Sequence, residues 1–327
     1  MTTVTQPETQ PDTREYMEVS TPRVHNLHHV EVFTPKPNES LDFFTRVLGL
    51  HETHREGQSV YLRGAGEWAR YSTILTEGPK PGLGHMAWQV AEPDQVEGWA
   101  RRFRDKGVEH KLEAGGSRFA QGDTLSFTGP FGHRTELFYD FERFESDTPS
   151  ALLSQCVKFP TPGIGARRLD HLNITARDVD EARDWYTDVL GFKLREAART
   201  PEGDIGVWMS VTSQVHDLAI MRDGMGERGR LHHIAYYLDT PETLLRAADT
   251  FVEEGTPIDA GPGKHGLTQA FFIYVFEPGG NRVELFSGGY PIHGPDWQPI
   301  IWDGANIEKA IVWYGGQLPD SFFNVAT

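Results

Sequence analysis

The sequence predicts an α+β fold of two homologous halves, each made of a strand, a helix and further strands, twice over. Three observations predict it: segments 27–50 and 169–192 resemble each other, two shorter pairs of segments continue the likeness, and breaker residues separate the halves near 145–165. Such internal similarity indicates that supersecondary units recur along the chain. At 327 residues the chain has room for two ordinary domains.

The first repeated unit begins as a strand and becomes a helix. Segment LHHVEVFTPKPNESLDFFTRVLGL (27–50) matches LDHLNITARDVDEARDWYTDVLGF (169–192). Alternating apolar residues predict the strand, and apolar residues three or four apart predict the helix. Gly49 and Gly191 end the helices, where a left-handed residue is expected. The apolar stripes of the two helices are Leu41, Phe44 and Leu48, and Ala182, Tyr186 and Val189.

The later units repeat as well. LGHMAWQV (83–90) matches LHHIAYYL (231–238), and FTGPFGHRTELFY (127–139) matches VFEPGGNRVELFS (275–287). Each pair supplies strands, and a helical segment lies between them in both halves. In the second half Thr240 is the expected N-cap of that helix. We therefore expect a flexible tail at 1–20, an N-terminal domain at 21–148, a C-terminal catalytic domain at 149–290, and an extension at 291–327 that packs on this domain or on a neighbouring subunit.

Composition excludes several classes of function. The formal net charge is −16 and no stretch is dense in Lys or Arg, so a nucleic-acid or anionic-membrane partner is not expected. No apolar run is long enough to span a membrane, and the polar N-terminus does not resemble a secretory signal. Cys156 is the only cysteine, which excludes an internal disulfide and fits a cytoplasmic location.

Aligning the halves brings three acid/base residues into register. The second and third members of each set are 51 residues apart in both halves. Two histidines and a carboxylate on neighbouring strands are the ligand set of a non-heme Fe(II) oxygenase, which leaves open positions for substrate and dioxygen. The aligned sets are His29, His85 and Glu136 in the first half, and His171, His233 and Glu284 in the second.

Two adjacent histidines compete for one place in the second set. His233 aligns with His85, whereas His232 aligns with Gly84. Because adjacent strand residues point to opposite faces of a sheet, we expect only one of the pair to be a ligand. We predict that His233 is the ligand and that His232 faces the other way, in a structural or second-sphere role.

The surroundings of the two sets favour the second half as the working site. Oxygen chemistry on a phenolic substrate needs groups that move protons, such as histidine and tyrosine. The first half has Tyr71, Ser117, Ser126 and Glu31 at the aligned positions, and we expect its His29, His85 and Glu136 to be a silent relic. The corresponding residues of the second half are His216, His265, Tyr274 and Asn173.

These residues carry a resemblance to a known family. LDHLN (169–173), QVHDLAI (214–220), GRLHHIAYYL (229–238) and GPGKHGLTQAFFIYVFEPGGNRVELF (261–286) resemble the type I extradiol ring-cleavage dioxygenases. More narrowly, they are similar to the catechol 2,3-dioxygenases of the vicinal-oxygen-chelate superfamily. The resemblance implies four βαβββ modules in two domains, each a curled mixed sheet around a funnel, with iron in the C-terminal domain only.

The resemblance also implies a role for each residue. Two histidines and a glutamate, His171, His233 and Glu284, would ligate Fe(II). The same ligand set accepts Mn(II), but the resemblance favours iron. His216 would be the acid–base catalyst. His265 and Tyr274 would hydrogen-bond the catechol oxygens. Asn173 would line the oxygen side of the pocket, and Trp208 would form part of the pocket wall.

The implied reaction is extradiol cleavage of a catechol by O2 to a 2-hydroxymuconic semialdehyde type product, as a step in aromatic-compound degradation. The resemblance also implies a homotetramer. Relatives that cleave homoprotocatechuate hold its carboxylate with arginines, where this chain has Ala260 and Ala310. Because a buried carboxylate without a cationic partner is unfavourable, we predict catechol or an alkylcatechol as substrate. Two alternatives stay open: a metal-dependent glyoxalase- or epimerase-like lyase, and a ligand-binding module on the same scaffold.

Overall fold

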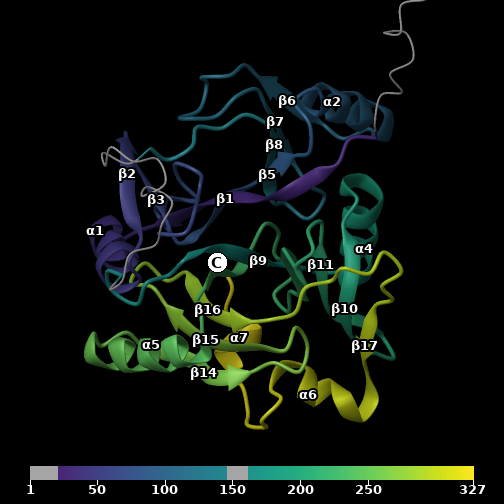
Figure 1. Ribbon diagram of the computed structural model, residues 1–327. Helices are drawn as coiled ribbons and strands as arrows, with labels where there is room; N and C mark the ends of the chain where they lie inside the picture. Colours follow the sequence, from purple (N-terminus) through teal and green to yellow (C-terminus); the bar gives the residue numbers. More distant parts are fainter. Residues whose placement is uncertain (1–20, 146–160) are drawn as a thin grey trace, which may run out of the picture.

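The computed structural model describes residues 21–145 and 161–327. The predicted tail at 1–20, Cys156 and most of the predicted bend between the halves lie outside the described residues. In Figure 1 the strands of the first half lie above those of the second half, and the C-terminus lies between the two.

The first half forms one eight-stranded sheet in the order β2-β3-β4-β1-β5-β8-β7-β6. Two βαβββ modules build it, the first ending at β4 and the second beginning at β5. Its elements are β1 (Val24–Thr34), α1 (Pro37–Asp42), η2 (Phe43–Val47), β2 (His51–Glu56), β3 (Ser59–Arg63), β4 (Thr73–Glu77), β5 (Gly82–Val90), α2 (Gln95–Lys106), β6 (His110–Glu113), β7 (Thr124–Thr128) and β8 (Arg134–Phe138).

The second half repeats this arrangement in a nine-stranded sheet of order β14-β15-β16-β13-β9-β12-β11-β10-β17. Its elements are β9 (Arg168–Ala176), α4 (Val179–Trp185), η3 (Tyr186–Leu190), β10 (Lys193–Thr200), β11 (Gly203–Ser210), β12 (Leu218–Arg222), β13 (Leu231–Tyr237), α5 (Pro241–Glu253), β14 (Ile258–Lys264), β15 (Ala270–Phe276), β16 (Arg282–Gly288), β17 (Ile300–Trp302), η4 (Gly304–Asn306), α6 (Ile307–Ile311) and α7 (Asp320–Asn324).

The predicted fold class, two mixed-sheet domains of βαβββ modules, is confirmed. Apart from β17, the second sheet has the same strand connections as the first. Both repeated helices stop where predicted, because Gly49 and Gly191 have φ of 89° and 79°. The periodicity did not predict that both helices end in a π-helical turn, η2 and η3. Thr240 caps α5 as predicted, accepting a hydrogen bond from the Thr243 backbone N–H.

Buried polar contacts join the two halves. The Tyr236 hydroxyl lies 2.7 Å from the Thr73 hydroxyl, and the Asn281 side chain donates to the Phe33 carbonyl at 2.9 Å. Ser40 donates to Glu277, which also holds the turn between β15 and β16. These contacts fix the first half against β13, β15 and β16, the strands that carry the site.

The C-terminal segment packs on the second half. Strand β17 pairs in parallel with β10, and Thr327 exchanges backbone hydrogen bonds with Leu231 at the start of β13. The Trp302 indole donates to Glu196 at 2.7 Å. The segment therefore lies over the face of the sheet that contains the second triad.

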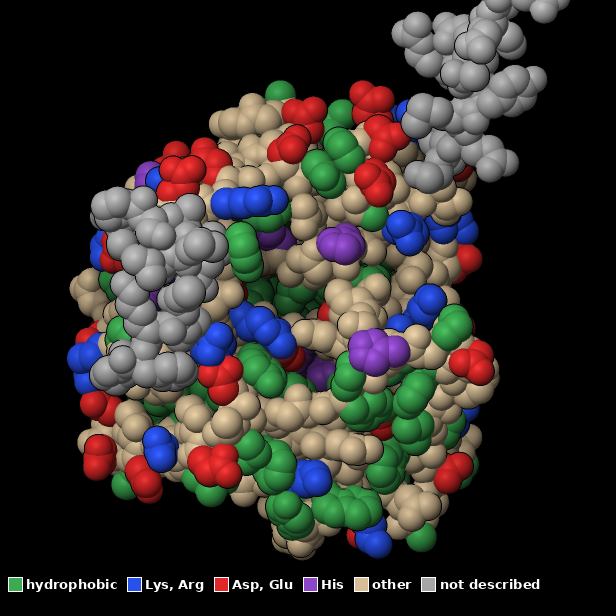
Figure 2. Space-filling model, viewed as in Figure 1, with side chains coloured by type: hydrophobic (Ala, Val, Ile, Leu, Met, Phe, Trp, Pro, Cys, Tyr) green, Lys and Arg blue, Asp and Glu red, His purple; other side chains and the backbone are tan. Residues whose placement is uncertain are grey.

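Two observations bear on membranes and polyanions. Across residues 21–145 and 161–327, the helices are too short or too polar to traverse a bilayer. On the face seen in Figure 2, acidic and basic side chains are interspersed rather than gathered into a basic patch.

Candidate active site

Three neighbouring strands place the second triad on one face of the sheet. In the pairing register Ala235 on β13 lies opposite His171 on β9 and opposite Glu284 on β16. Residues directly opposite each other share a face, and His233 lies two residues before Ala235 on that same face. The small Ala235 side chain leaves the space into which the three larger side chains converge.

The donor atoms of this triad lie close together and away from water. Glu284 Oε2 is 3.0 Å from both His171 Nε2 and His233 Nε2, and the two nitrogens are 3.4 Å apart. All three side chains are buried. Burial raises the pKa of Glu284, but the contacts with His233 and His171 hold it well below its usual value overall. The triad therefore offers a carboxylate and two imidazole nitrogens to one cation.

Hydrogen bonds on the far side of each ring direct the Nε2 lone pairs into the site. His171 Nδ1 lies 2.9 Å from Asp170 Oδ2 and donates to it, so Nε2 would be the ligand. Burial lowers the pKa of His171, but Asp170 and Glu284 raise it to about 9 overall, so a metal ion would displace a proton from Nε2. His232 Nε2 lies 2.7 Å from the Phe322 carbonyl and must donate to it. His232 Nδ1 then accepts from His233 Nδ1 at 2.7 Å, which leaves the lone pair of His233 Nε2 facing the triad.

The orientation of His232 differs from the sequence expectation. The pairing of β13 with β9 shifts register between Leu231 and His233, so a bulge interrupts the alternation of faces at His232. The two imidazoles are therefore in contact instead of pointing to opposite faces. A bulge of this kind has no signal in the hydrophobic pattern.

The other predicted pocket residues face the same space. The His216 ring centroid is 4.0 Å from that of His171, and among the described residues neither His216 Nδ1 nor Asn173 Oδ1 has a hydrogen-bond partner. Buried polar atoms without partners are rare, and both residues line the same pocket as the triad. Burial, reinforced by His171, lowers the pKa of His216 well below 6.5, so its imidazole is neutral.

His265 and Tyr274 form a connected pair beside the triad. His265 Nδ1 donates to the Ile311 carbonyl at 2.5 Å, so its Nε2 accepts from the Tyr274 hydroxyl at 3.1 Å. Tyr274 lies opposite Glu284 in the register of β15 and β16. Burial and then the negative charge of Glu284 raise the pKa of Tyr274 well above 10, so the phenol stays protonated.

One pocket collects all eight residues that the sequence predicted for the site, including Trp208. It also contains residues that sequence reasoning missed, mostly apolar side chains from β12, β16 and the C-terminal segment: Met221, Leu267, Thr268, Phe286, Ile311 and Phe322. Ala87 and Ala235 indicate the space for the triads already in the sequence, because each small residue stands two positions after an aligned histidine, His85 or His233.

The first triad converges too, but its surroundings differ. His29, His85 and Glu136 are buried with their donor atoms within 4.8 Å of one another. Tyr71, at the place of His216, donates to the Phe119 carbonyl at 3.1 Å and belongs to an apolar cluster. A proton-handling group facing an open pocket is therefore replaced by a packed side chain.

Comparisons with known proteins agree with this geometry. The family described as the Glyoxalase/Bleomycin resistance protein/Dioxygenase superfamily matches residues 26–137 and 168–285. A manganese-dependent 2,3-dihydroxybiphenyl 1,2-dioxygenase of Geobacillus genomosp. 3 is 39% identical over 302 residues, covering 91% of this chain and 96% of the relative. The chain belongs to the type I extradiol dioxygenases of this superfamily.

Other extradiol dioxygenases are similar along nearly their whole length. A metapyrocatechase of Geobacillus stearothermophilus is 36% identical, covering 92% of each chain. The crystal structure of homoprotocatechuate 2,3-dioxygenase from Arthrobacter globiformis matches with a TM-score of 0.84 and 26% identity, covering 95% of this chain and 94% of the other. The family resemblance predicted from the sequence is confirmed.

The residues of this extradiol dioxygenase fit a divalent metal ion. Two imidazoles and one carboxylate, with their lone pairs directed inward, are the donor set that such ions take in oxygenases. Among the described residues Glu284 Oε1 has no hydrogen-bond partner, and His265 Nε2 lies 3.6 Å from it, which leaves this oxygen available to a cation.

Proposed function

We propose that this chain cleaves the ring of catechol or an alkylcatechol with O2, next to the diol, using Fe(II) held by His171, His233 and Glu284. The product would be of the 2-hydroxymuconic semialdehyde type. The observation that carries the proposal is the convergence of the triad with the unpartnered His216 and Asn173 atoms and the Tyr274–His265 pair in one pocket. The relatives that cleave catechols support it.

The metal and the chain would have separate tasks. A ferrous ion bound at the triad supplies redox capacity and an open face for both reactants. Two neutral imidazoles and one carboxylate leave a divalent ion with one net positive charge, so a catechol monoanion would be the matching substrate form. Holding both reactants at fixed positions removes much of the entropic barrier.

The chain's own residues would move the protons. His265 Nε2 accepts a hydrogen bond from Tyr274 in the free site, so the pair can exchange that bond for one to a catechol hydroxyl and take its proton. His216 is neutral and buried, which allows Nδ1 or Nε2 to accept a proton and return it later. Asn173 would line the side of the pocket where oxygen binds.

The pocket supports an uncharged substrate. None of its described lining residues is a lysine or arginine. Ala260 packs with Phe272, Tyr274 and Phe322, and Ala310 is fully buried, so neither position offers a cation. A neighbouring cavity of about 250 Å³ shares Trp208, Met221 and Ile311 with the pocket. Its walls are mostly apolar, and of the charged residues that also line it Arg230 is paired with Asp223 at 2.9 Å. The apolar part would accommodate an alkyl or aryl substituent on the ring.

A substrate panel tests the specificity. We expect kcat/KM for homoprotocatechuate to be at least about 100-fold lower than for catechol or 3-methylcatechol, because an unpaired buried charge costs about 3 kcal/mol or more. Formation of the yellow ring-cleavage product is the measurement. The variant Ala260→Arg is expected to narrow this gap, whereas Ala260→Met, of similar length without charge, is not. Equal kcat/KM values in the unmodified enzyme would contradict the proposed substrate class.

Metal reconstitution tests the identity of the ion. After removal of metal with a chelator, we expect anaerobically added Fe(II) to restore ring cleavage and Mn(II) to restore less of it. The manganese dependence of the 39% identical relative makes Mn(II) the second candidate. Full activity with Mn(II) and none with Fe(II) would overturn the proposed metal while leaving the ring-cleavage reaction intact.

We also propose that catalysis belongs to the domain at 149–290 and that the N-terminal domain at 21–148 takes no part in the chemistry. All donors of the proposed centre come from one half, which does not favour a lyase that shares a metal between two halves. A homotetramer is proposed as the assembly. The exposed aromatic side chains Trp313, Tyr314 and Phe323 in the C-terminal extension would be candidate contacts.

A further inference from the structure

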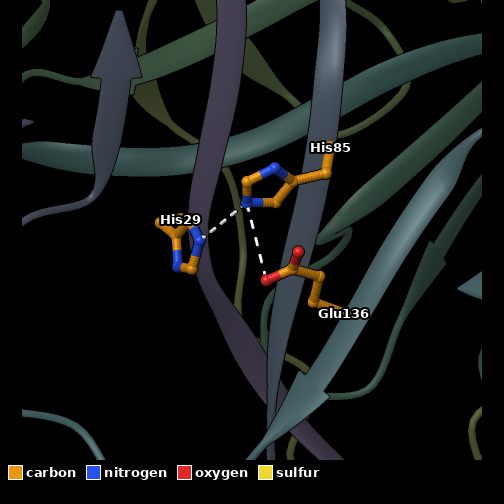
Figure 3. A group of neighbouring side chains, drawn as sticks. All are labelled: His29, His85 and Glu136. Carbon is orange, nitrogen blue, oxygen red and sulfur yellow. Dashed lines mark hydrogen bonds and ion pairs between the residues drawn. The ribbon is translucent and has the colours of Figure 1, made fainter. Parts of the chain in front are cut away.

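We propose that His29, His85 and Glu136 bind a second divalent metal ion, with a structural rather than a catalytic role. The three side chains come from β1, β5 and β8 and point toward one another (Figure 3). His29 Nε2 lies 3.0 Å from His85 Nε2, which lies 3.7 Å from Glu136 Oε2. These separations are close to those of the second triad, and this site lies outside the pocket proposed for ring cleavage.

The same pairing register between neighbouring strands brings the residues of both triads together. Ala87 on β5 lies opposite His29 on β1 and opposite Glu136 on β8, as Ala235 does in the other half. His85 precedes Ala87 by two residues and shares its face. The small residue again leaves room for three larger side chains to converge. The backbone therefore presents the donors of the first half as it presents those of the second.

The side chains that contact the far nitrogens of His85 and His29 support the site. His85 Nδ1 lies 2.9 Å from Glu31 Oε2, and Glu31 is itself fixed by a hydrogen bond from Thr76. A carboxylate on the far nitrogen of a histidine is a common support for a metal ligand, because it leaves the other nitrogen as a lone pair. His29 Nδ1 contacts His28 Nδ1 at 2.9 Å, as His233 contacts His232.

The charge around the first triad is less favourable to a cation than the charge around the second. Arg118 and Arg134 approach Glu136 at Oε1, at 2.9 and 3.9 Å, whereas Oε2 accepts a hydrogen bond of 3.4 Å from the Gln121 side chain and lies 3.7 Å from His85 Nε2. Arg118 also pairs with Glu113 at 2.8 Å. Glu113 in turn pairs with the exposed Lys111 at 2.9 Å. Three carboxylates therefore face two guanidinium groups and one ammonium group, against two carboxylates and Arg168 in the second half. The first site is close to neutral, whereas the second carries one net negative charge toward a cation.

Two features of the first triad indicate an ion with a structural role that is bound more weakly than an ion at the second triad. Among the described residues His28 Nε2 has no hydrogen-bond partner that would fix its tautomer, so without metal His29 Nε2 can donate to His85 Nε2, and metal binding must replace that hydrogen bond. Tyr71, with its ring centroid 5.0 Å from that of His29, and the cluster of Tyr61, Ile74 and Phe119 occupy the space where a substrate would lie. The first half would hold a closed ion site.

Equilibrium dialysis of the metal-stripped full chain against Zn²⁺, followed by metal analysis, tests the proposal. We expect the wild-type chain to bind close to two ions. Each double variant, which loses two ligands of one triad, should bind close to one ion: His233→Ala/Glu284→Gln for the second triad and His85→Ala/Glu136→Gln for the first. His110→Ala, which removes a histidine outside both triads, is expected to retain two. A folded His233→Ala/Glu284→Gln variant that binds no ion would overturn the second site. Loss of ring cleavage in that same variant concerns the proposed function alone.

A further variant covers the case in which the first-half double substitution fails to fold. Arg118→Met removes a positive charge from Glu136 and should tighten Zn²⁺ binding at the first site by about tenfold or more, measured in the His233→Ala/Glu284→Gln background. Unchanged or weaker binding would contradict the assignment of Glu136 as a ligand.

Discussion

Replacement of Glu284 by glutamine is expected to lower ring-cleavage turnover by about three orders of magnitude. The substitution removes a negative charge that lies 3.0 Å from both His171 and His233, in a buried site. Removing one partner of a buried charge cluster costs about 3–5 kcal/mol, which corresponds to roughly 10²–10⁴ in rate or affinity. Turnover with catechol and the iron content of the purified variant are the measurements.

A matched control separates loss of the ligand from loss of stability. Glu277 is also buried and lies at the end of the hairpin that carries Glu284, where it accepts hydrogen bonds from Ser40 and from the turn. Glu277→Gln should lower the melting temperature while keeping iron and turnover. If Glu284→Gln retained both its metal and its turnover, the proposed centre would be wrong.

The second large effect is expected for His216→Phe. General acid–base catalysis contributes about 10²–10⁴-fold, so kcat should fall by that factor while iron content and catechol binding persist. The His216 ring centroid lies 5.8 Å from that of Phe286. Phenylalanine keeps a buried aromatic ring at this position but has no ring nitrogen that could accept a proton. Single-turnover kinetics on the iron-loaded variant would locate the loss in the chemical step.

His133→Phe provides the comparison for His216→Phe. His133 is equally buried, but its Nε2 donates to the Arg230 carbonyl and it is not among the residues that line the pocket, so its replacement should affect stability and not kcat. An unchanged kcat in His216→Phe would eliminate the acid–base role of that residue.

Much of the fold and the composition of the site could be predicted because the chain repeats itself. Aligning the halves fixed the strands, the glycines that end the helices, and the two triads, since register in a sheet follows from the apolar pattern. Within one sequence, however, the pattern does not reveal contacts between distant segments. The Asp170 contact, the bulge at His232 and the carbonyls of Ile311 and Phe322 depend on tertiary packing.

The likeness of the two triads also limits what sequence reasoning can decide. His29, His85 and Glu136 differ from the second set less in their own geometry than in what surrounds them, namely Tyr71, Arg118 and the apolar cluster behind Tyr61. The absence of aligned proton-handling residues predicts that the first half is not catalytic. It does not predict whether an ion binds there, because binding depends on distances and charge.

Two carbonyl groups of the C-terminal segment set the tautomers of His232 and His265, and Thr327 pairs with β13 beside them. Until these residues have docked on the sheet, His233 has no fixed donor arrangement and the pocket lacks part of its wall. Metal is therefore expected to be acquired only by a chain that has docked this segment, and a truncation before Phe322 should yield protein that folds its sheets yet loads metal poorly.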